Sequence, residues 1–335
     1  MVNVLVIGAG RRVKGAVLPA LHCLGDRFRV AAVVARSARA ITVGGRELHT
    51  VASLDDVELA AIDLVYLAVS LPQVPRVLAD LAARPVAHAV LMIDTPVLPP
   101  SGLAASRHFA AFGRVLVAED TLALPPYLLA RDLIESGAIG RLQTIFFFHS
   151  GFKHHALASL KRLSGDQPIR RIVNHKFAGK LRQKEIELGG GVRAVMYEPR
   201  DYATGKLLLA GERGFIADYD HAGESVRRIG YQVEGPIYRG LTLDGQPVPP
   251  AGLDLAYLER VGTDVFDGTP MNTMKLRGLM DLLDAALAPS SPYHYTVEEG
   301  IADHLAMRVV DRVGFVAAPH LVRHLLPLAR RLGRG

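Results

Sequence analysis

The sequence has very little cysteine and no tryptophan: Cys23 is the only thiol in 335 residues. A lone cysteine excludes a disulfide within the chain, which is typical of proteins from a reducing compartment. We interpret Cys23 as a small, buried apolar side chain on a helix.

Three other absences narrow the class of protein. No uninterrupted apolar run reaches the roughly 18 residues that a membrane-spanning helix needs. The first ten residues lack a basic segment and read as a buried strand rather than a signal peptide. The formal net charge is +6, yet no tract of lysine or arginine alternates with aromatic residues. We therefore expect a cytoplasmic protein with no membrane and no nucleic-acid partner.

The chain does contain enough apolar material for a large core. Hydrophobic residues make up 50% of it and charged residues 21%, which excludes a disordered protein. Because single cores stop growing at roughly 250–300 residues, the length predicts two domains. The strand–helix alternation ends near residue 121, so we expect domains at 1–121 and 122–335.

Residues 1–121 alternate short apolar strands with helical segments. We predict strands at 2–7, 28–35, 64–69, 89–93 and 115–117, a helix at 75–83 and another helix that ends at 109–113. Continuously apolar strands between helices indicate a parallel sheet covered on both faces, as in a doubly wound Rossmann domain. Ligands of such sheets bind at the carboxyl ends of the strands, where Glu119 and Asp120 follow the fifth strand.

For residues 122–335 we predict an α+β domain with a large, mostly antiparallel sheet, which serves substrate binding and oligomerisation. Residues 151–184 are basic and poorly periodic. The last helices are candidates to pack back on the first domain. The expected elements are a helix at 125–136, a β-rich run at 142–149, a helix between the glycine triplet 189–191 and Gly211, antiparallel strands over 213–250, and helices at 272–287 and 297–318.

A glycine turn typical of dinucleotide-binding proteins follows the first strand. Gly8 and Gly10 match the first two glycines of G-x-G-x-x-G, and Val13 is at the third position. Such a turn lets the backbone approach a pyrophosphate, which the free N–H groups at the helix N-terminus then bind. We therefore predict cofactor contacts from Gly8, Gly10, Arg11, Arg12 and Val13.

The end of the second strand predicts which dinucleotide binds. NAD-dependent enzymes tend to have Asp or Glu there, to bind the adenosine ribose. This sequence has Arg36, Ser37 and Arg39 and no carboxylate. A guanidinium can bind a 2′-phosphate through two charge-assisted hydrogen bonds, so we predict NADP(H) as the cofactor.

In this order and spacing, the motifs resemble those of the Gfo/Idh/MocA oxidoreductase family along nearly the whole chain. The glycine turn precedes Leu-Pro-Ala-Leu at 18–21, and the segments at 135–142 and 295–302 resemble two later family turns. Residues 70–73 are where the family has Thr-Pro-Asn, and 94–96 are at its Glu-Lys-Pro position. The resemblance implies further cofactor contacts from Ser70, Leu71, Pro72, Gln73, Asp94 and Thr95.

The chain departs from the family at two catalytic positions. The family's Glu-Lys-Pro lysine lies near the nicotinamide, whereas this chain has Thr95, which cannot act as a cation. The family often has Asp-x-x-x-His after a glycine triplet, with two side chains one helical turn apart. Counting forward from Gly191 selects 195 and 199. Counting back from Gly211 selects Tyr197 and Asp201, which we prefer because they are polar.

Tyr197 is therefore our first candidate for the proton donor, with Asp201 orienting it, and Lys153 and His155 are the runners-up. Residues 151–184 contain nine Lys or Arg and one acid, Asp166, which favours an anionic substrate. We expect no metal site, because the side chains of adjacent histidines at 154 and 155 should point in different directions.

These observations predict an NADP-dependent oxidoreductase that reduces a C=O or C=N group of a small, anionic metabolite. An imine needs less electrophilic help than a ketone, so loss of the family lysine favours imine reduction, for instance in specialised metabolism. The alternative is a redox-neutral lyase, cyclase or epimerase, or a ligand-binding subunit on the same scaffold. A sheet face without helices predicts a homodimer or homotetramer.

Overall fold

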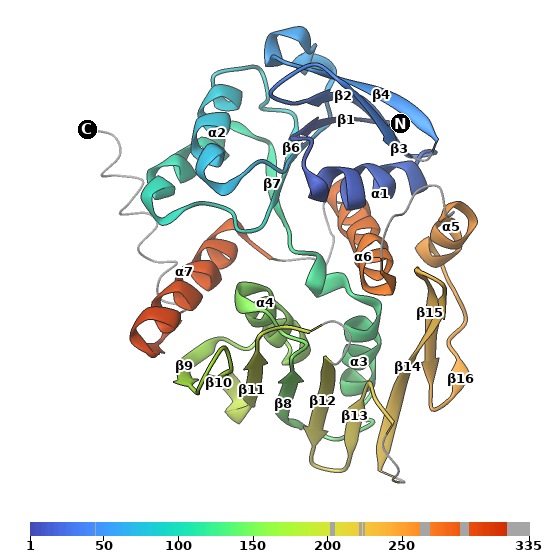
Figure 1. The fold of residues 1–335 in the computed structure, drawn as a ribbon, viewed down its shortest axis with the longest axis vertical. Coiled ribbons are helices and arrows are strands. Elements are labelled where there is room, and N and C mark those ends of the chain that lie inside the picture. Colours follow the sequence, from blue (N-terminus) through green and yellow to red (C-terminus); the bar gives the residue numbers. More distant parts are fainter. Residues whose placement is uncertain are drawn as a thin grey trace.

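The computed structural model contains two sheets, one above the other, with helices between and around them (Figure 1). The described residues are 1–43, 45–201, 205–220, 223, 225–261, 269–288 and 295–319.

The first sheet has seven strands in the order β3-β4-β2-β1-β5-β6-β7. All of its pairings are parallel except that of β3 with β4, which form a hairpin at one edge. This topology confirms the predicted Rossmann domain, and its strand order reverses between β1 and β5, where such sheets bind ligands. The strands are β1 (Val2–Ile7), β2 (Phe28–Val34), β3 (Ala40–Val43), β4 (Arg46–Val51), β5 (Leu64–Leu67), β6 (Val90–Asp94) and β7 (Arg114–Ala118).

The helix after the glycine turn is continuous over residues 11–23, but its middle, Val13–Val17, is wound as a π-helix before α1 (Leu18–Cys23) begins. The next helix, α2 (Val74–Ala82), agrees with the prediction. Between β6 and β7 the chain forms a series of 3-10 turns, Pro100–Ala111, in place of the expected helix.

The second sheet has ten strands in the order β16-β15-β14-β13-β12-β8-β11-β10-β9-β17. Only the pairs β8–β11 and β13–β14 are parallel among those described, so the sheet is mostly antiparallel, as predicted. Its strands are β8 (Leu142–Phe148), β9 (Ile169–Lys176), β10 (Arg182–Leu188), β11 (Arg193–Glu198), β12 (Lys206–Gly211), β13 (Phe215–Ala217), β14 (Val226–Glu234), β15 (Ile237–Leu243), β16 (Gln246–Pro247) and β17 (Phe315–Ala317).

Helices α3 (Pro125–Glu135) and α4 (Lys153–Leu163) cover the face of this sheet that is turned toward the Rossmann domain (Figure 1). Phe147 of β8 packs on Tyr127 of α3, with ring centroids 5.9 Å apart. The opposite face carries the half-buried side chains Phe146 and Phe148, because successive residues of a strand point to opposite sides.

Two expectations for this half of the chain were wrong. Residues after the glycine triplet 189–191 form strands β11 and β12 rather than a helix. The stretch 151–184 is not irregular: it contains helix α4, strand β9 and the start of β10. Helix α4 therefore precedes the glycine triplet, and the candidate site residue Tyr197, after the triplet, is on a strand instead of a helix.

Helices α5 (Leu253–Arg260), α6 (Pro270–Leu287) and α7 (Val297–Val313) complete the described elements. Ile301 of α7 belongs to the same apolar core as Val117 of β7, and Arg114 donates to the carbonyl of Ala288, just after α6, over 2.9 Å. The final helices thus contact the Rossmann sheet. Among the described residues, no helix combines the length and apolar character needed to cross a bilayer.

Candidate functional site

The glycine turn meets the geometric demands of close backbone approach. Gly8 has φ +119°, and a Cβ there would lie 2.2 Å from the carbonyl oxygen of Ala68, so only glycine fits. A Cβ on Gly10 would have no atom within 4 Å. The backbone at Gly10 therefore borders open space at the start of the helix, where a phosphate would bind.

Val13 is fully buried at the third glycine position, in the wide π turn that begins with it. Arg11, two residues earlier, is exposed. Glycine at this position normally permits close packing of helix against strand, and we attribute the local widening of the helix to the larger side chain.

Arg12 joins the glycine turn to the ends of two other strands. Its Nη1 lies 2.6 Å from Oδ2 of Asp120, after β7, and its Nε lies 3.4 Å from Oδ1 of Asp94, at the end of β6. Burial opposes the charged guanidinium, but attraction to Asp120 and Asp94 outweighs it and raises the pKa of Arg12 well above its ordinary value. A fixed cation therefore lies at the carboxyl edge of the sheet.

The segment after β2 is exposed and lies against the glycine turn. Arg39 donates from Nη2 to the carbonyl oxygen of Ala9 over 3.2 Å. Thr50 of β4 donates to the carbonyl oxygen of Ser37 over 2.9 Å. Arg36, Ser37 and Arg39 are all exposed, so the predicted 2′-phosphate contacts are accessible.

The other predicted cofactor contacts lie at the same sheet edge. Ser70, Leu71, Pro72 and Gln73 form an accessible turn directly after β5. Asp94 and Thr95, at the end of β6, are half-buried. The structure thus brings these residues together with the glycine turn, as expected for the carboxyl ends of neighbouring parallel strands.

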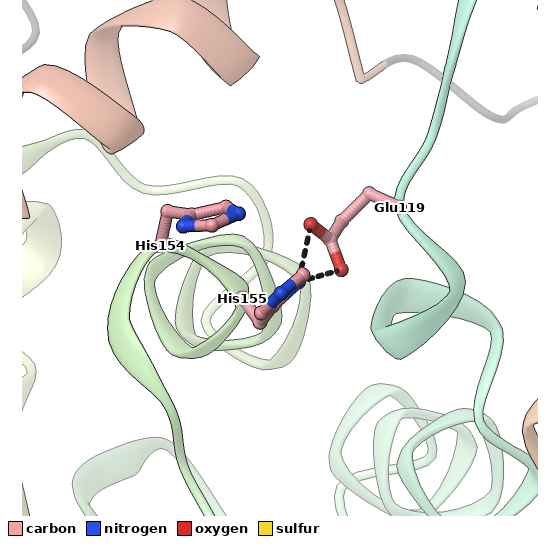
Figure 2. Close-up of side chains that lie close together, drawn as sticks. All are labelled: Glu119, His154 and His155. Atoms are coloured by element: carbon pink, nitrogen blue, oxygen red, sulfur yellow. Dashed lines mark hydrogen bonds and ion pairs between the residues drawn. The ribbon is translucent and has the colours of Figure 1, made fainter. Parts of the chain in front are cut away.

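A buried carboxylate–imidazole pair lies next to Arg12 and Asp120. Nδ1 of His155, in the first turn of α4, is 2.9 Å and 2.8 Å from the two carboxylate oxygens of Glu119, which follows β7 (Figure 2). The hydroxyl of Thr121 donates to Oε1 of Glu119 over 2.7 Å. Glu119 is fully buried, whereas the His155 side chain retains 24% exposure.

The two groups stabilise each other's charge. Burial would raise the pKa of Glu119, but the charge and hydrogen bond of His155 outweigh it and lower that pKa to about 2. Burial would lower the pKa of His155, but Glu119 outweighs it and raises that pKa above its ordinary value. The pair therefore favours imidazolium beside carboxylate, with Nδ1–H donated to Glu119 and Nε2 left as the atom that can exchange a proton.

His154 lies against this pair instead of pointing away from it. Its ring centroid is 4.1 Å from that of His155, so the expectation that the two side chains diverge was wrong (Figure 2). Burial lowers the pKa of His154 to about 3. One ligand atom each from Glu119, His154 and His155 lie within 4.8 Å of one another, at a place where the sequence led us to expect no metal site.

Tyr197 and Asp201 are not part of this cluster. Tyr197 is on β11, where its neighbours Met196 and Glu198 are buried on the side of α4. Its own ring therefore lies on the other face of the sheet, stacked on Phe148 with centroids 5.9 Å apart. Asp201 is exposed after the strand. The premise that they share one helical turn was wrong, because the segment is extended.

The runners-up lie at the site itself. Lys153 is the exposed first residue of α4, and its backbone N–H donates to Glu198 over 3.1 Å. His155 is two residues further on.

The sequence did contain a signal for α4. Ala156, Leu157, Leu160 and Leu163 have helical spacing and are all buried. The basic residues between them hid this pattern. The partnership of His155 with Glu119 joins positions 36 residues apart, and only the fold reveals it.

The basic residues of 151–184 do not form one patch. Lys161 is paired with Asp303 over 2.8 Å, and Lys184 is fully buried against Glu198 and Asp311. Others, such as Arg171, are exposed on β9. Part of the positive charge of residues 151–184 is therefore used in ion pairs within the fold.

A cavity of about 630 Å³ opens at the opposite end of β1 from the glycine turn. It is lined by Met1, Phe28 and Arg260 among others, and contains none of the site residues described above.

No family model matches this sequence, and no curated protein does. Solved structures do match it: they are named as oxidoreductases and dehydrogenases, and the two-domain fold that this chain shares with them agrees with the fold expected from the sequence. At this level of identity the likeness concerns the fold alone.

Three of these structures illustrate the match. An oxidoreductase of Agrobacterium radiobacter, in complex with NAD⁺, L-tartaric acid and magnesium, is 14% identical, with a TM-score of 0.65 over 96% of this chain and 99% of its own. An oxidoreductase of Thermotoga maritima is 14% identical, with a TM-score of 0.62 over 96% and 99%. The WlbA dehydrogenase of Bordetella pertussis, in complex with NADH and UDP-GlcNAcA, is 14% identical, with a TM-score of 0.57 over 94% and 98%.

Proposed function

We propose that this chain is a nicotinamide-dependent oxidoreductase that reduces a C=O or C=N group of a small, anionic metabolite. The observation that carries the proposal is the buried Glu119–His155 pair at the carboxyl edge of the Rossmann sheet, next to Arg12 and Asp120. A proton donor at the place where such folds bind nucleotides is what a reductase needs.

The residues fit a nicotinamide dinucleotide. The close approach at Gly8 and the open space at Gly10 suit a pyrophosphate at the helix N-terminus. The names of two similar structures mention NAD⁺ and NADH for those proteins. In this chain Arg36, Ser37 and Arg39 offer cations and a hydroxyl, and no carboxylate, to the adenosine ribose. We therefore assign the preference to NADP(H).

His155 is the proton donor of the proposed reaction. A bound NADPH would supply the hydride. Glu119 fixes the imidazole by accepting its Nδ1–H, so Nε2 delivers the proton to the oxygen or nitrogen of the reduced group. Glu119 remains ionised throughout, because its charge stabilises the imidazolium before transfer.

Arg12 supplies the positive charge that the family resemblance assigns to the lysine replaced by Thr95. Its guanidinium is paired with Asp94 and Asp120 and cannot give up its proton, so it is a fixed positive charge that exchanges no proton with the substrate. Such a site suits an imine, which takes its proton from His155 and needs little further electrophilic help.

An anionic substrate is supported by the exposed cation at the start of α4. Lys153 lies with its Nζ 5.1 Å from the ring centroid of Phe152, and the Phe152 ring is stacked near His155. A substrate whose carboxylate binds Lys153 would have its C=O or C=N group within reach of His155, in the same helix turn.

The test is a calorimetric titration of the full chain with NADPH and with NADH, followed by assays with small keto and imino acids. We expect tighter NADPH binding, weakened about tenfold or more in Arg36→Ala, while NADH binding stays the same. Tighter NADH binding would overturn the cofactor preference. No binding of either, or turnover without net NADPH consumption, would overturn the reductase and favour a redox-neutral role.

A further inference from the structure

The imidazole of His154 has no assigned task in the proposed reaction. His154 is 5% exposed, and its Nε2 is a buried polar atom without a hydrogen-bond partner in the described structure. Buried polar atoms are nearly always paired, so an unpaired one in this position calls for a ligand. The edge of His304 packs on its ring, with centroids 5.3 Å apart, and Nε2 of His304 is also unpaired.

The partners for such a ligand are already in place. Glu119 and His155 each contribute an atom within 4.8 Å of the His154 ligand atom. Figure 2 shows the Glu119 carboxylate, which follows β7, next to the imidazole rings of His154 and His155 at the start of α4. A carboxylate and two imidazoles are a donor set that zinc commonly takes in proteins.

The spacing suits one metal ion after a small adjustment. Zinc binds nitrogen at about 2.0–2.1 Å and carboxylate oxygen at about 2.0–2.2 Å, so two ligands of a tetrahedral ion lie roughly 3.3 Å apart. No two of the three atoms therefore have to approach each other by more than roughly 1.5 Å, and the Glu119 carboxylate is already 2.8 Å from Nδ1 of His155. Rotation of side chains on a helix terminus and a loop supplies a movement of that size.

We propose that Glu119, His154 and His155 form a binding site for a divalent transition metal ion of the zinc class. Three protein ligands leave a fourth position open to water or an anion. The local balance of charge fits, because the dication offsets the Glu119 carboxylate and leaves a net positive site for anions. His154 is the residue that distinguishes this site from the proton-transfer pair.

The metal-bound and proton-transfer states exclude one another. A metal ion on Glu119 displaces the hydrogen bond from Nδ1 of His155, which the proposed reaction requires. Zinc is therefore an inhibitor of the proposed reductase. This consequence rests on the proposed function, whereas metal binding itself does not.

Cobalt(II) is the probe, because its visible absorption reports coordination without any turnover. We expect the chelator-treated full chain to bind one Co²⁺ with intense bands of a four- or five-coordinate site, and Zn²⁺ to displace it. His154→Gln should weaken Zn²⁺ binding more than about tenfold, since even residues behind the ligands change metal affinity by 10–100-fold.

The chain offers a matched control at its surface. His175 lies 3.2 Å from Glu185 on exposed strands, which is the same pair of groups without burial. His175→Gln should leave the Co²⁺ spectrum and the Zn²⁺ affinity of the wild type unchanged. If His175→Gln removes the signal and His154→Gln does not, the metal is bound at the surface and the proposal is wrong.

A measurement on the wild type keeps the proposal testable if His154→Gln does not fold. X-ray absorption of the zinc-loaded chain should show two imidazoles in the first coordination shell, and none or one would overturn the site. An octahedral, weakly absorbing Co²⁺ spectrum would also overturn it. Failure of metal binding leaves the cofactor titration unaffected, so the two proposals fail separately.

Discussion

Single side chains carry the proposed chemistry, and the pairing of His155 with Glu119 is the sharpest case. His155→Gln should lower turnover about 100-fold to 10,000-fold, because it removes the proton donor. Tyr197→Phe serves as the comparison, since Tyr197 lies on the far face of the second sheet. Steady-state kinetics of the two variants decide between them, and a severe loss only in Tyr197→Phe would return the role to the tyrosine.

The same pair predicts a pH dependence. His155 donates only when protonated, and Glu119 raises its pKa, so activity should be present at low pH and fall as the pH rises through that pKa. Glu119→Gln removes the anion and lowers the pKa of His155. The falling limb of the kcat/KM profile should therefore move to lower pH in Glu119→Gln, and an unmoved limb would exclude His155 as the titrating group.

Acid stability provides a check that does not depend on turnover. Because the pKa of Glu119 is lowered from 4.5 to about 2 in the folded chain, its contribution is present above its ordinary pKa and is lost as the pH falls. That contribution is on the order of 3 kcal/mol. Denaturant unfolding should show the wild type losing this amount between about pH 5 and pH 2, and Glu119→Gln losing much less.

At the scale of elements, the two glycines of the glycine turn have different expected roles: Gly8 is needed for folding and Gly10 for cofactor binding. Gly8→Ala should destabilise the fold by several kcal/mol, since its Cβ would collide with the Ala68 carbonyl and φ is positive. Gly10→Ala should unfold like the wild type, because its Cβ meets nothing, yet bind NADPH more weakly. Thermal melting and calorimetry measure the two effects, and unaltered binding in Gly10→Ala would place the pyrophosphate elsewhere.

Strands and helices were predicted correctly where one pattern of hydrophobic residues dominated the local sequence. The five apolar strands of the Rossmann sheet and helix α3 were predicted nearly to their bounds, because burial on both faces or on one helical stripe leaves a strong pattern. The helix expected between the glycine triplet and Gly211 was wrong, because Arg193–Glu198 alternates buried and accessible residues like a strand.

The candidate site was harder to predict than the fold. Lys153 has φ +46°, and such a departure at the start of α4 cannot be read from neighbouring residue types. It accompanies an arrangement in which the adjacent rings of His154 and His155 lie against each other, with centroids 4.1 Å apart. The cofactor edge was predictable because parallel strands end together, whereas the pairing of Glu119 with α4 depends on how the two sheets are docked.

At the scale of the whole molecule, buried ion pairs join distant parts of the chain. Lys184 of β10 is fully buried between Glu198 of β11 and Asp311 of α7. Lys184→Ala should cost about 3–5 kcal/mol, because it leaves the Glu198 carboxylate buried without its partner. Lys176→Ala, on the exposed face of β9, is the control and should change the free energy of unfolding by less than about 0.5 kcal/mol.

The prediction of a homodimer or homotetramer depends on the face of the ten-stranded sheet that is turned away from α3 and α4. Phe146, Phe148 and Tyr197 form a stacked, half-buried aromatic row on it. We expect light scattering to give a mass of two or four chains, and Phe148→Asp to shift it toward one. A wild-type monomer would contradict this prediction.

Arg12 has a consequence for how such a chain can change over evolution. One guanidinium is the shared counter-ion of Asp94 and Asp120. A lysine placed at position 95, next to Asp94, would compete for the same carboxylate and add a second cation to a half-buried edge. The two cations are thus alternatives. A chain with lysine at position 95 would therefore favour an uncharged residue at position 12, and the two positions should covary among relatives of this chain.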